Sequence, residues 1–435
     1  MNPQEFKRRR TALMRMMGKG SIAIIPSTHE KIRNRDVVYP FRQDSDFWYL
    51  TGFDEPDAVA VLIPGRKAGD YILFCRERDP ERETWDGHRA GTEGAINDYG
   101  AADAFPITDL DDILPGLIEG CESVFYTMGV NPAFDQRMTH WLNELRSKGR
   151  TGARTPEEFV ALEHLLHDLR LFKSRGEINA MKKAAKISMQ AHRKAMRRAR
   201  PGAWEYEVEA ELLSEFRAHG TREAYGSIVG AGPNSCTLHY VSNNQEMKDG
   251  DLLLIDAGCE YGYYASDITR TFPVNGRFSA EQRAIYNIVL AAQKAGIDKC
   301  RAGNRFNEPH DATVQVITRG LIKLGLLNGT PAKLIKEGAY RKFYMHRAGH
   351  WLGLDVHDVG DYKVASEWRE LEPGMVLTVE PGIYIPPGTR GVAKKWWNIG
   401  VRIEDDVLVT RGEPDVLTGK LIKDPDEIEK WIQAA

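Results

Sequence analysis

Four acidic residues in the second half of the chain each lie at the end of an apolar or extended run, and they are the side chains best suited to shared chemistry: Asp256, Asp267, Glu380 and Glu404. One acid at the end of a strand is weak evidence, whereas four in such positions favour a common site. Carboxylates that lie close together repel one another, and one of them takes up a proton unless a cation lies between them. Their hard oxygen atoms suit a divalent metal ion.

The first two acids belong to one stretch, 252–271, which reads as a strand, a turn and a second extended segment. A symmetric hairpin about Tyr261 and Gly262 would place Asp256 directly opposite Asp267. Cβ atoms of directly opposed residues are about 4.5–5.5 Å apart. Turn-flanking aspartates on solvated strand ends are the alternative, and this stretch alone does not decide between the two.

Three histidines follow close together, at His346, His350 and His357. Histidine is the commonest metal ligand in proteins and the usual proton shuttle near neutral pH. A single histidine is more often structural, but three so close together favour a functional site.

The charge of the acids predicts the number of metal ions. Four ionised carboxylates carry a charge of about −4, which a pocket cannot hold without compensation. Two divalent cations would neutralise it, and two metals about 3.5–4 Å apart are typical of two-metal hydrolases. A set rich in carboxylates favours Mn(II) or a similar hard ion over a thiolate-type zinc site.

These residues require a framework of strands and helices, and 435 residues predict two domains. In the first, we expect helices at 5–17 and 133–148 and strands at 22–25, 47–50, 59–63, 71–75 and 124–128, which together make an α/β domain with a mixed sheet. A further helix is expected to run from about 157 to 172. Ser174 and Glu177 have capping-box spacing at the start of the next long helix. We therefore predict domains at 1–173 and 174–435.

Composition restricts the class of protein. The chain is 42% hydrophobic and 28% charged with a formal net charge of −3, which indicates a globular protein and gives no basic excess for nucleic-acid binding. Five scattered cysteines form no Cys-x-x-Cys pair, which favours a reducing compartment. We find no signal-peptide pattern and no run of about 18 apolar residues, so a cytoplasmic protein without a membrane partner is expected.

The order and spacing of the candidate ligands resemble a known family. Asp256-x10-Asp267 followed by His350, Glu380 and Glu404 looks like the metal signature of the pita-bread metallopeptidases, which include methionine aminopeptidase, prolidase and aminopeptidase P. The long first domain and the segments 43–49, 255–258, 267–273 and 353–360 are most similar to the bacterial aminopeptidase P branch. The resemblance covers essentially the whole chain.

The resemblance implies a creatinase/prolidase-like α/β domain at 1–173, serving oligomerisation and pocket completion, and a catalytic pita-bread α+β domain at 174–435. It implies two divalent metal ions, with Mn(II) expected, on five ligands: Asp256, Asp267, His350, Glu380 and Glu404.

It also implies roles for the remaining polar residues. Glu380 would accept a proton beside the bridging hydroxide, His357 would hydrogen-bond the tetrahedral intermediate, and His239 and His346 would line the substrate pocket. Tyr384 and Arg402 match residues that support the metal site.

Three further matches concern the first domain and the far end of the substrate. Asp36 matches a first-domain acid near the site, and Arg369 a basic residue that could meet the far end of a peptide. Trp85, in a polar segment, matches an aromatic residue that a neighbouring subunit contributes to the pocket. A homo-oligomer, a tetramer or a dimer, is therefore expected.

The reaction implied is hydrolytic removal of an N-terminal residue from Xaa-Pro peptides. Prolidase activity, restricted to Xaa-Pro dipeptides, is the alternative among enzymes. A metal-free binding module on the same fold would be expected to have lost ligands, and all five are present. One residue departs from the family pattern: Arg347 stands where relatives usually have a small residue, so it could narrow the pocket or offer a cation to a substrate carboxylate.

Overall fold

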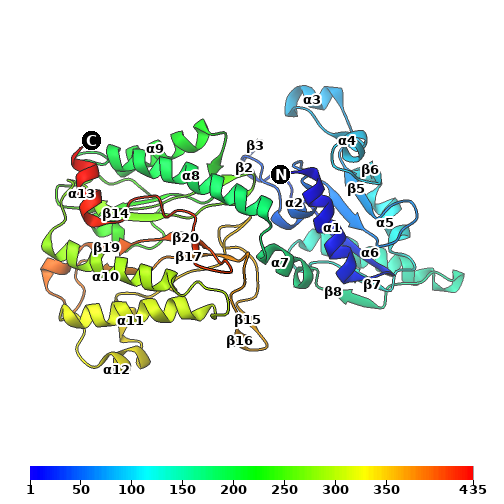
Figure 1. Cartoon of the computed structure of the whole chain (residues 1–435). Helices are drawn as coiled ribbons and strands as arrows, with labels where there is room; N and C mark the ends of the chain where they lie inside the picture. Colours follow the sequence, from blue (N-terminus) through cyan, green and yellow to red (C-terminus); the bar gives the residue numbers. More distant parts are fainter. Residues whose placement is uncertain (435) are drawn as a thin grey trace. The chain divides into compact units, whose positions relative to one another are not determined.

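The computed structural model describes residues 1–434, and the chain divides into two compact units, Met1–Arg170 and Leu171–Ala435. Each unit has its own apolar core and is described by itself (Figure 1). Both combine helices with sheets, so the predicted α/β class is confirmed.

The first unit is built on a six-stranded sheet in the order β6-β5-β4-β1-β7-β8. β1 pairs in parallel with β7 and antiparallel with β4, so the sheet is mixed, as predicted. Its strands are β1 (Ser21–Pro26), β4 (Val59–Leu62), β5 (Tyr71–Cys75), β6 (Asp103–Pro106), β7 (Ser123–Phe125) and β8 (Glu158–Val160), and β2 (Ile32–Asn34) and β3 (Val37–Val38) form a separate hairpin. Its helices are α1 (Pro3–Met17), α2 (Ser45–Thr51), α3 (Pro80–Asp86), α4 (Gly91–Asn97), α5 (Leu110–Ile118), α6 (Pro132–Ser147) and α7 (Glu163–Leu171), the last of which ends at the first residue of the second unit.

The core of this unit lies between the sheet and helices α5 and α6. Leu114 of α5 and Trp141 of α6 are fully buried against Ile24 of β1 and Phe74 of β5. The spacing of apolar residues in α6 predicted this helix, because one face must cover the sheet.

Two expectations for this unit are wrong. Segment 47–50 was expected to be a strand and lies in helix α2, because the Asp44 side chain accepts a hydrogen bond from the Phe47 amide and Gly52, at φ 68°, ends the helix. Segment 158–160 was expected to be helical and instead forms edge strand β8, in parallel with β7.

The second unit places short sheets between pairs of helices. Helices α8 (Arg175–Arg198) and α9 (Glu205–Ala218) form one pair, and α10 (Ala280–Ile297) and α11 (Asn307–Lys323) form another (Figure 1). Ser174 and Glu177 make the predicted capping box at the start of α8. The remaining helices are α12 (Pro331–Lys336) and α13 (Pro425–Gln433).

The strands of this unit are β9 (Arg222–Glu223), β10 (Ile228–Ala231), β11 (Leu252–Asp256), β12 (Cys259–Tyr261), β13 (Tyr264–Ala265), β14 (Thr269–Pro273), β15 (Lys363–Val364), β16 (Glu367–Trp368), β17 (Val376–Val379), β18 (Gly382–Ile385), β19 (Ile399–Arg402), β20 (Asp405–Leu408) and β21 (Asp415–Val416). Antiparallel pairs β11–β14, β17–β20 and β18–β19 carry the residues of interest. Buried apolar side chains of β11, β14, β18 and β19 and of both helix pairs form one core, and those of β17 and β20 belong to a second cluster with Phe306 and Trp351.

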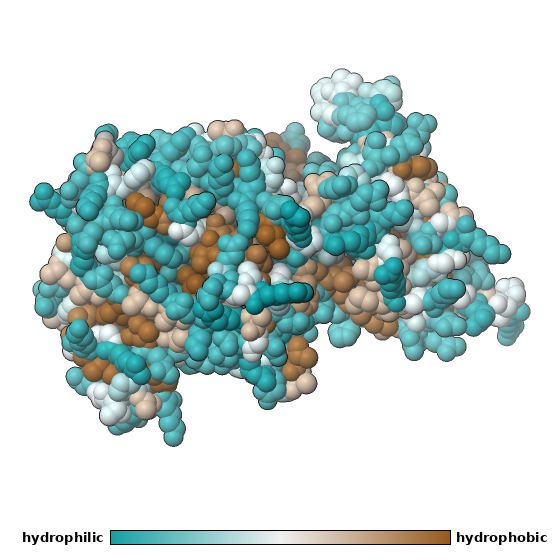
Figure 2. All heavy atoms as spheres, viewed as in Figure 1, coloured by the Kyte–Doolittle hydropathy of each residue, from teal (hydrophilic) through white to brown (hydrophobic). Residues whose placement is uncertain are grey.

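No helix within residues 1–434 is long and apolar enough to cross a membrane. On the face drawn in Figure 2, hydrophilic residues dominate and apolar atoms appear as separate patches among them.

Candidate metal centre and substrate pocket

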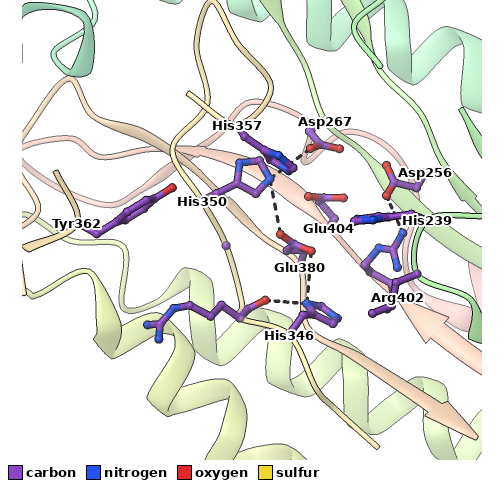
Figure 3. A pocket seen from close by; sticks show the side chains of 13 residues that line it. His239, Asp256, Asp267, His346, His350, His357, Tyr362, Glu380, Arg402 and Glu404 are labelled. Atoms are coloured by element: carbon purple, nitrogen blue, oxygen red, sulfur yellow. Dashed lines mark hydrogen bonds and ion pairs between the residues drawn. The ribbon is translucent and has the colours of Figure 1, made fainter. Parts of the chain in front are cut away.

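One cavity in the second unit, of about 390 Å³, collects most of the polar residues that the sequence singled out. Its lining residues are Leu238, His239, Asp256, Asp267, His346, Arg347, Gly349, His350, His357, Tyr362, Glu380, Arg402 and Glu404. The four carboxylates face a common space, with the His350 and His357 rings on one side and His239 and Arg402 on the other (Figure 3).

All four acids lie where strands end. Asp256 is the last residue of β11, Glu380 follows β17, and Glu404 separates β19 from β20. Asp267 lies two residues before β14. A strand end frees the backbone from the regular ladder, so acids on separate strands can turn toward one point while the strands remain buried.

The predicted opposition of Asp256 and Asp267 is wrong by two residues, because Asp256 pairs with Thr269 across β11 and β14. The turn is centred between Gly262 and Tyr263, with Tyr261 opposite Tyr264. A shift of two residues keeps a side chain on the same face of a sheet. Both carboxylates therefore still face the cavity, as diagonal rather than direct neighbours.

Close backbone packing at Gly258 brings the segment that carries Asp267 near the end of β11. A Cβ atom at that position would lie 1.7 Å from the Ser266 carbonyl oxygen and 3.2 Å from the Asp267 amide nitrogen. Only glycine fits, so the segment that carries Asp267 can approach the end of β11 closely.

The Tyr225 hydroxyl joins the two aspartates. It lies 2.7 Å from Oδ1 of Asp256 and 2.5 Å from Oδ1 of Asp267. Burial, followed by the charges of both aspartates, raises the pKa of Tyr225 well above its usual value, so the phenol keeps its proton and acts as a donor. The sequence analysis missed this residue, because a tyrosine in a loop before β10 carries no pattern that indicates such a role.

His350 has its ring orientation set by the backbone. Its Nδ1 is 2.9 Å from the Trp351 carbonyl oxygen, which can only accept a proton, so Nδ1–H donates and Nε2 faces the acids. Nε2 lies 3.5 Å from Asp267 and 3.7 Å from Glu380. Metal-binding histidines commonly donate their other N–H to a backbone carbonyl in this way.

Ligand atoms of Asp267, His350 and Glu404 all lie within 4.8 Å of one another, which makes these residues a candidate metal site. Asp256 and Glu380 line the same cavity. The Asp256 carboxylate also accepts a hydrogen bond of 2.6 Å from Arg402 Nη2, so part of its charge is already offset.

The raised pKa values of three of the four acids indicate that the site lacks positive charge, although, against the effect of burial, His350 and Tyr225 lower the pKa of the fourth, Asp267. Burial, and then the neighbouring carboxylates, raise the pKa of Glu404 well above its usual value. Burial also raises the pKa of Glu380 to about 7 and, against the opposing charge of Arg402, that of Asp256. Burial would lower the pKa of His350, but Asp267 and Glu380 raise it to about 9. Without metal, acids in this site take up protons and His350 becomes cationic, which supplies positive charge that the carboxylates need. Two divalent cations would supply the same charge, so the donor set fits them.

Arg402, Tyr384 and His346 form a hydrogen-bonded chain at one side of the cavity. Arg402 Nη1 donates to the Tyr384 hydroxyl at 3.0 Å, and that hydroxyl lies 2.9 Å from His346 Nε2. His346 Nδ1 is 2.7 Å from the Arg347 carbonyl oxygen. Burial, with the nearby Arg402 charge, lowers the pKa of His346 to about 3, so the ring is neutral, with its proton on Nδ1.

His239 and His357 are exposed on the cavity wall, and neither makes a hydrogen bond within residues 1–434. The ring centroids of His357 and His350 are 4.4 Å apart. Burial and the His350 charge lower the pKa of His357, so its neutral ring can donate one N–H to a bound molecule.

Four predicted residues are not among those that line the cavity. Tyr384 contacts two residues that do, His346 and Arg402. Asp36 is exposed in the turn between β2 and β3, and Trp85 is 85% exposed on α3. Arg369 follows β16, and its guanidinium lies 5.7 Å from the centre of the Phe172 ring.

Sequence reasoning also missed one residue that lines the cavity and one that contacts Glu404 and Arg402. Tyr362 lines the cavity and stacks on Trp351 with a centroid distance of 5.6 Å. Thr269 donates a hydrogen bond of 2.6 Å to Glu404, and Arg402 Nε lies 3.1 Å from the Thr269 hydroxyl. Thr269 is the strand partner of Asp256, so the correct hairpin register would have identified it.

Comparison with known proteins gives consistent matches over the whole chain. Residues 179–411 match the model of metallopeptidase family M24, and residues 6–126 match the aminopeptidase P N-terminal domain. The Xaa-Pro aminopeptidase of Escherichia coli (strain K12) is 45% identical over 434 residues, covering 99% of this chain and 98% of that protein.

Solved structures agree with the sequence matches. A Pseudomonas aeruginosa aminopeptidase is 61% identical with a TM-score of 0.99, covering 100% of this chain and 98% of that one. Zn-substituted E. coli aminopeptidase P in complex with product is 44% identical with a TM-score of 0.97, covering 100% of this chain and 99% of that one.

Proposed function

The chain belongs to metallopeptidase family M24, and from this membership we propose that it is a metal-dependent exopeptidase that hydrolyses the bond between an N-terminal residue and a following proline. The observation that carries the proposal is that four carboxylates at strand ends and His350 line one cavity. The chain that contains this cavity is related over its full length to Xaa-Pro aminopeptidases.

We assign the metals to five side chains, Asp256, Asp267, His350, Glu380 and Glu404. Two divalent cations bound there would offset the carboxylate charge and supply Lewis-acid activation of water and of the scissile carbonyl. The oxygen-rich ligand set favours Mn(II) or a similar hard ion.

Glu380 is the proposed proton acceptor. A general base must lie close to the proton it takes up, and Glu380 lines the same cavity as the other proposed metal ligands, with Oε1 3.7 Å from His350 Nε2. The carboxylate takes a proton from the attacking water and returns it to the proline nitrogen when the C–N bond breaks. The leaving nitrogen needs that proton, because the deprotonated form of a secondary amine is a poor leaving group.

The histidines are proposed to act on the substrate. His357, neutral and exposed beside His350, donates an N–H to the oxygen of the scissile carbonyl as negative charge develops there. His346, fixed by Tyr384 and the Arg347 carbonyl, and His239 line the wall against which the substrate lies.

Residues away from the cavity lining enter the proposal by motif. Asp36 is proposed to support the site from the first unit, Arg369 to contact the far end of a peptide, and Trp85 to complete the pocket of a neighbouring subunit in a tetramer or a dimer. A cytoplasmic location is proposed because all five cysteines are free thiols.

The test compares substrates on one preparation. Protein reconstituted with Mn(II) should release the N-terminal residue from Xaa-Pro-Xaa tripeptides and leave matched Xaa-Ala-Xaa peptides intact. Cleavage of Xaa-Pro dipeptides alone would indicate prolidase activity instead. No proline-dependent cleavage of either length would contradict the proposal.

Metal dependence is measured separately. Chelation should abolish hydrolysis and Mn(II) should restore it, and Glu404→Ala should lose stoichiometric metal because it removes a carboxylate from the centre of the site. Full activity in protein shown by elemental analysis to be free of divalent metal would exclude the two-metal assignment.

A further inference from the structure

The cavity contains two arginines, and they differ in what they bind. Arg402 is buried, and its guanidinium donates to Asp256, Tyr384 and Thr269. Arg347 is exposed, lines the same cavity, and forms no ion pair with any carboxylate within residues 1–434. Of the two guanidinium groups, that of Arg347 is therefore the one still able to bind an anion.

An aromatic side chain holds Arg347 in place. Its guanidinium carbon lies 4.6 Å from the centre of the Trp368 ring on β16. Trp368 is packed in turn against Phe306, with ring centroids 6.3 Å apart, and Phe306 lies 4.6 Å from both Trp351 and Tyr362. A guanidinium stacked on a fixed ring loses less conformational freedom when it binds a partner.

Arg347 also lies at a defined end of the cavity. Its stacking partner Trp368 packs on Phe306, and Phe306 packs on the lining residue Tyr362. Tyr362 lies on the opposite side of His350 from Arg402 and His239 (Figure 3). The carboxylate cluster separates these two ends. A ligand that spans the cavity thus meets acids in the middle and an unpaired cation near Tyr362.

On the basis of the proposed function, we propose that Arg347 is a specificity-determining residue that binds the free C-terminal carboxylate of a short peptide substrate. A peptide cleaved at its first bond has its carbonyl at the carboxylate cluster and its remaining residues extending away from it. In a tripeptide the terminal carboxylate is two residues past that carbonyl, about 7 Å along an extended chain. The planar guanidinium matches a carboxylate with two parallel hydrogen bonds.

The proposal sets the substrate class as short peptides with a free C-terminus. A C-terminal amide has nearly the same shape but no charge, so it keeps every other contact and loses this one. A charge-assisted contact at an exposed site contributes less to affinity than a buried one, and each tenfold change in affinity is a modest difference in free energy. We therefore expect a KM for the free acid about tenfold lower than for the amide.

The experiment measures KM and kcat for one Xaa-Pro-Xaa tripeptide as free acid and as amide, with wild type, Arg347→Gln and Lys363→Gln. Lys363 is the matched control, because its Nζ also lies 4.6 Å from the Trp368 ring centre but it does not line the cavity. Arg347→Gln should raise KM for the acid about tenfold, change KM for the amide less than twofold, and leave kcat for both unchanged. Lys363→Gln should keep the wild-type preference for the acid.

A second readout uses a probe that the enzyme does not cleave. The product Pro-Xaa dipeptide should inhibit wild type more strongly as the acid than as the amide, and Arg347→Gln should remove the difference, while Arg347→Lys should restore part of it.

Equal KM values for acid and amide in wild type would overturn the proposal while leaving the peptidase function intact. Equal loss of affinity for both peptides in Arg347→Gln would also overturn it, and would reduce Arg347 to a support for Trp368. Failure of the wild type to cleave either peptide would instead contradict the proposed function itself.

Discussion

The three histidines of the 346–357 segment differ in protonation because each ring has different neighbours. His350 faces Asp267 and Glu380, and its pKa is raised to about 9 in the absence of metal. His346 is buried near Arg402, and its pKa falls to about 3. His357 has a lowered pKa and no hydrogen-bond partner within residues 1–434. Similar residues in one motif are thus suited to three tasks: ligand, fixed wall and donor to substrate.

The proposed role of His357 predicts a defect in kcat. Loss of one hydrogen-bond donor to a developing oxyanion typically lowers kcat by about 10²–10³. His357→Ala should show a fall of that size and retain wild-type metal content by elemental analysis, because the ring is not among the candidate ligands. His140→Ala, at an exposed position of α6, is the control for general effects of histidine removal. Unchanged kcat, or loss of metal, would assign His357 a different role.

His192 is a buried histidine outside the cavity lining, and its pKa predicts how the free energy of unfolding depends on pH. Complete burial lowers the pKa of His192 to about 4; its Nε2 donates to the Ala257 carbonyl at 2.9 Å, and Nδ1 has no partner. Between pH 6.5 and about 4 the unfolded chain binds a proton that the folded chain does not. The contribution to stability is therefore complete above pH 6.5 and is lost as the pH falls, by about 2 kcal/mol at pH 5.

The measurement is urea unfolding at pH 7.5 and pH 5, with chelator present so that metal binding does not contribute. His192→Gln retains an N–H donor but does not titrate in this range, so the wild type should lose about 2 kcal/mol more than this variant between the two pH values. Equal losses in both proteins would show that His192 is protonated in the folded state.

At the scale of elements, the strands that end in acids could be recognised from sequence, but their register could not. The apolar runs before Asp256 and Glu380 predicted β11 and β17 well. The turn centre was placed one residue early, because Tyr263 adopts a positive φ of 70°, which is uncommon for tyrosine. The error kept both aspartates on the cavity face but hid the Asp256–Thr269 pairing, and with it the hydrogen bond from Thr269 to Glu404.

Local composition also gave the wrong secondary structure for segment 47–50, where capping residues determine that a helix forms. The residues of segment 47–50 are aromatic and apolar, which favours a strand, yet Asp44 and Gly52 begin and end a helix around them.

Tyr225 could not be found from the sequence for a different reason. Its role depends on two aspartates that lie more than thirty positions away in sequence and meet only in the folded unit.

The hairpin that carries Trp368 offers a prediction at this scale. Its two turn residues, Ala365 and Ser366, have φ values of 49° and 69°, a left-handed conformation that costs non-glycine residues about 1–2 kcal/mol each. Glycine is the preferred residue in such turns, although it gains entropy in the unfolded chain. Ser366→Gly should therefore increase the free energy of unfolding by about 0.5–1 kcal/mol.

Ser366→Val at the same position should have the opposite effect, because a β-branched side chain is poorly tolerated at positive φ. Urea unfolding of both variants beside the wild type checks the pair. Destabilisation by Ser366→Gly would show that the turn is not strained.

At the scale of the whole molecule, only one of the two units supplies residues that line the cavity. Every residue that lines the cavity belongs to the second unit, which also contains the candidate metal site. The first unit has a complete core of its own and supplies none of the residues lining that cavity. A domain of 170 residues with no part in the cavity wall is consistent with the proposed roles in assembly and pocket completion.

Trp85 carries the test of assembly. It lies on α3, a helix with no buried residues, and its side chain is 85% exposed. Tryptophan is unfavourable in water over so large an area and is among the residues that contribute most to interfaces. We predict a homo-oligomer in which Trp85 of one chain contacts the pocket of another. Light scattering on the wild type should give a mass of two or four chains.

The kinetic consequence follows from the kind of contact that Trp85 would make. A side chain that shapes a neighbour's pocket changes how the substrate binds, so Trp85→Ala should raise KM for an Xaa-Pro-Xaa tripeptide more than it lowers kcat, with metal content unchanged. Met128→Ala, another exposed apolar side chain of the first unit, is the matched control and should leave KM unaltered. A fully active monomer, or a Trp85→Ala enzyme with wild-type kinetics, would remove the inter-subunit role, since a residue that completes another chain's pocket cannot be lost without effect on substrate binding.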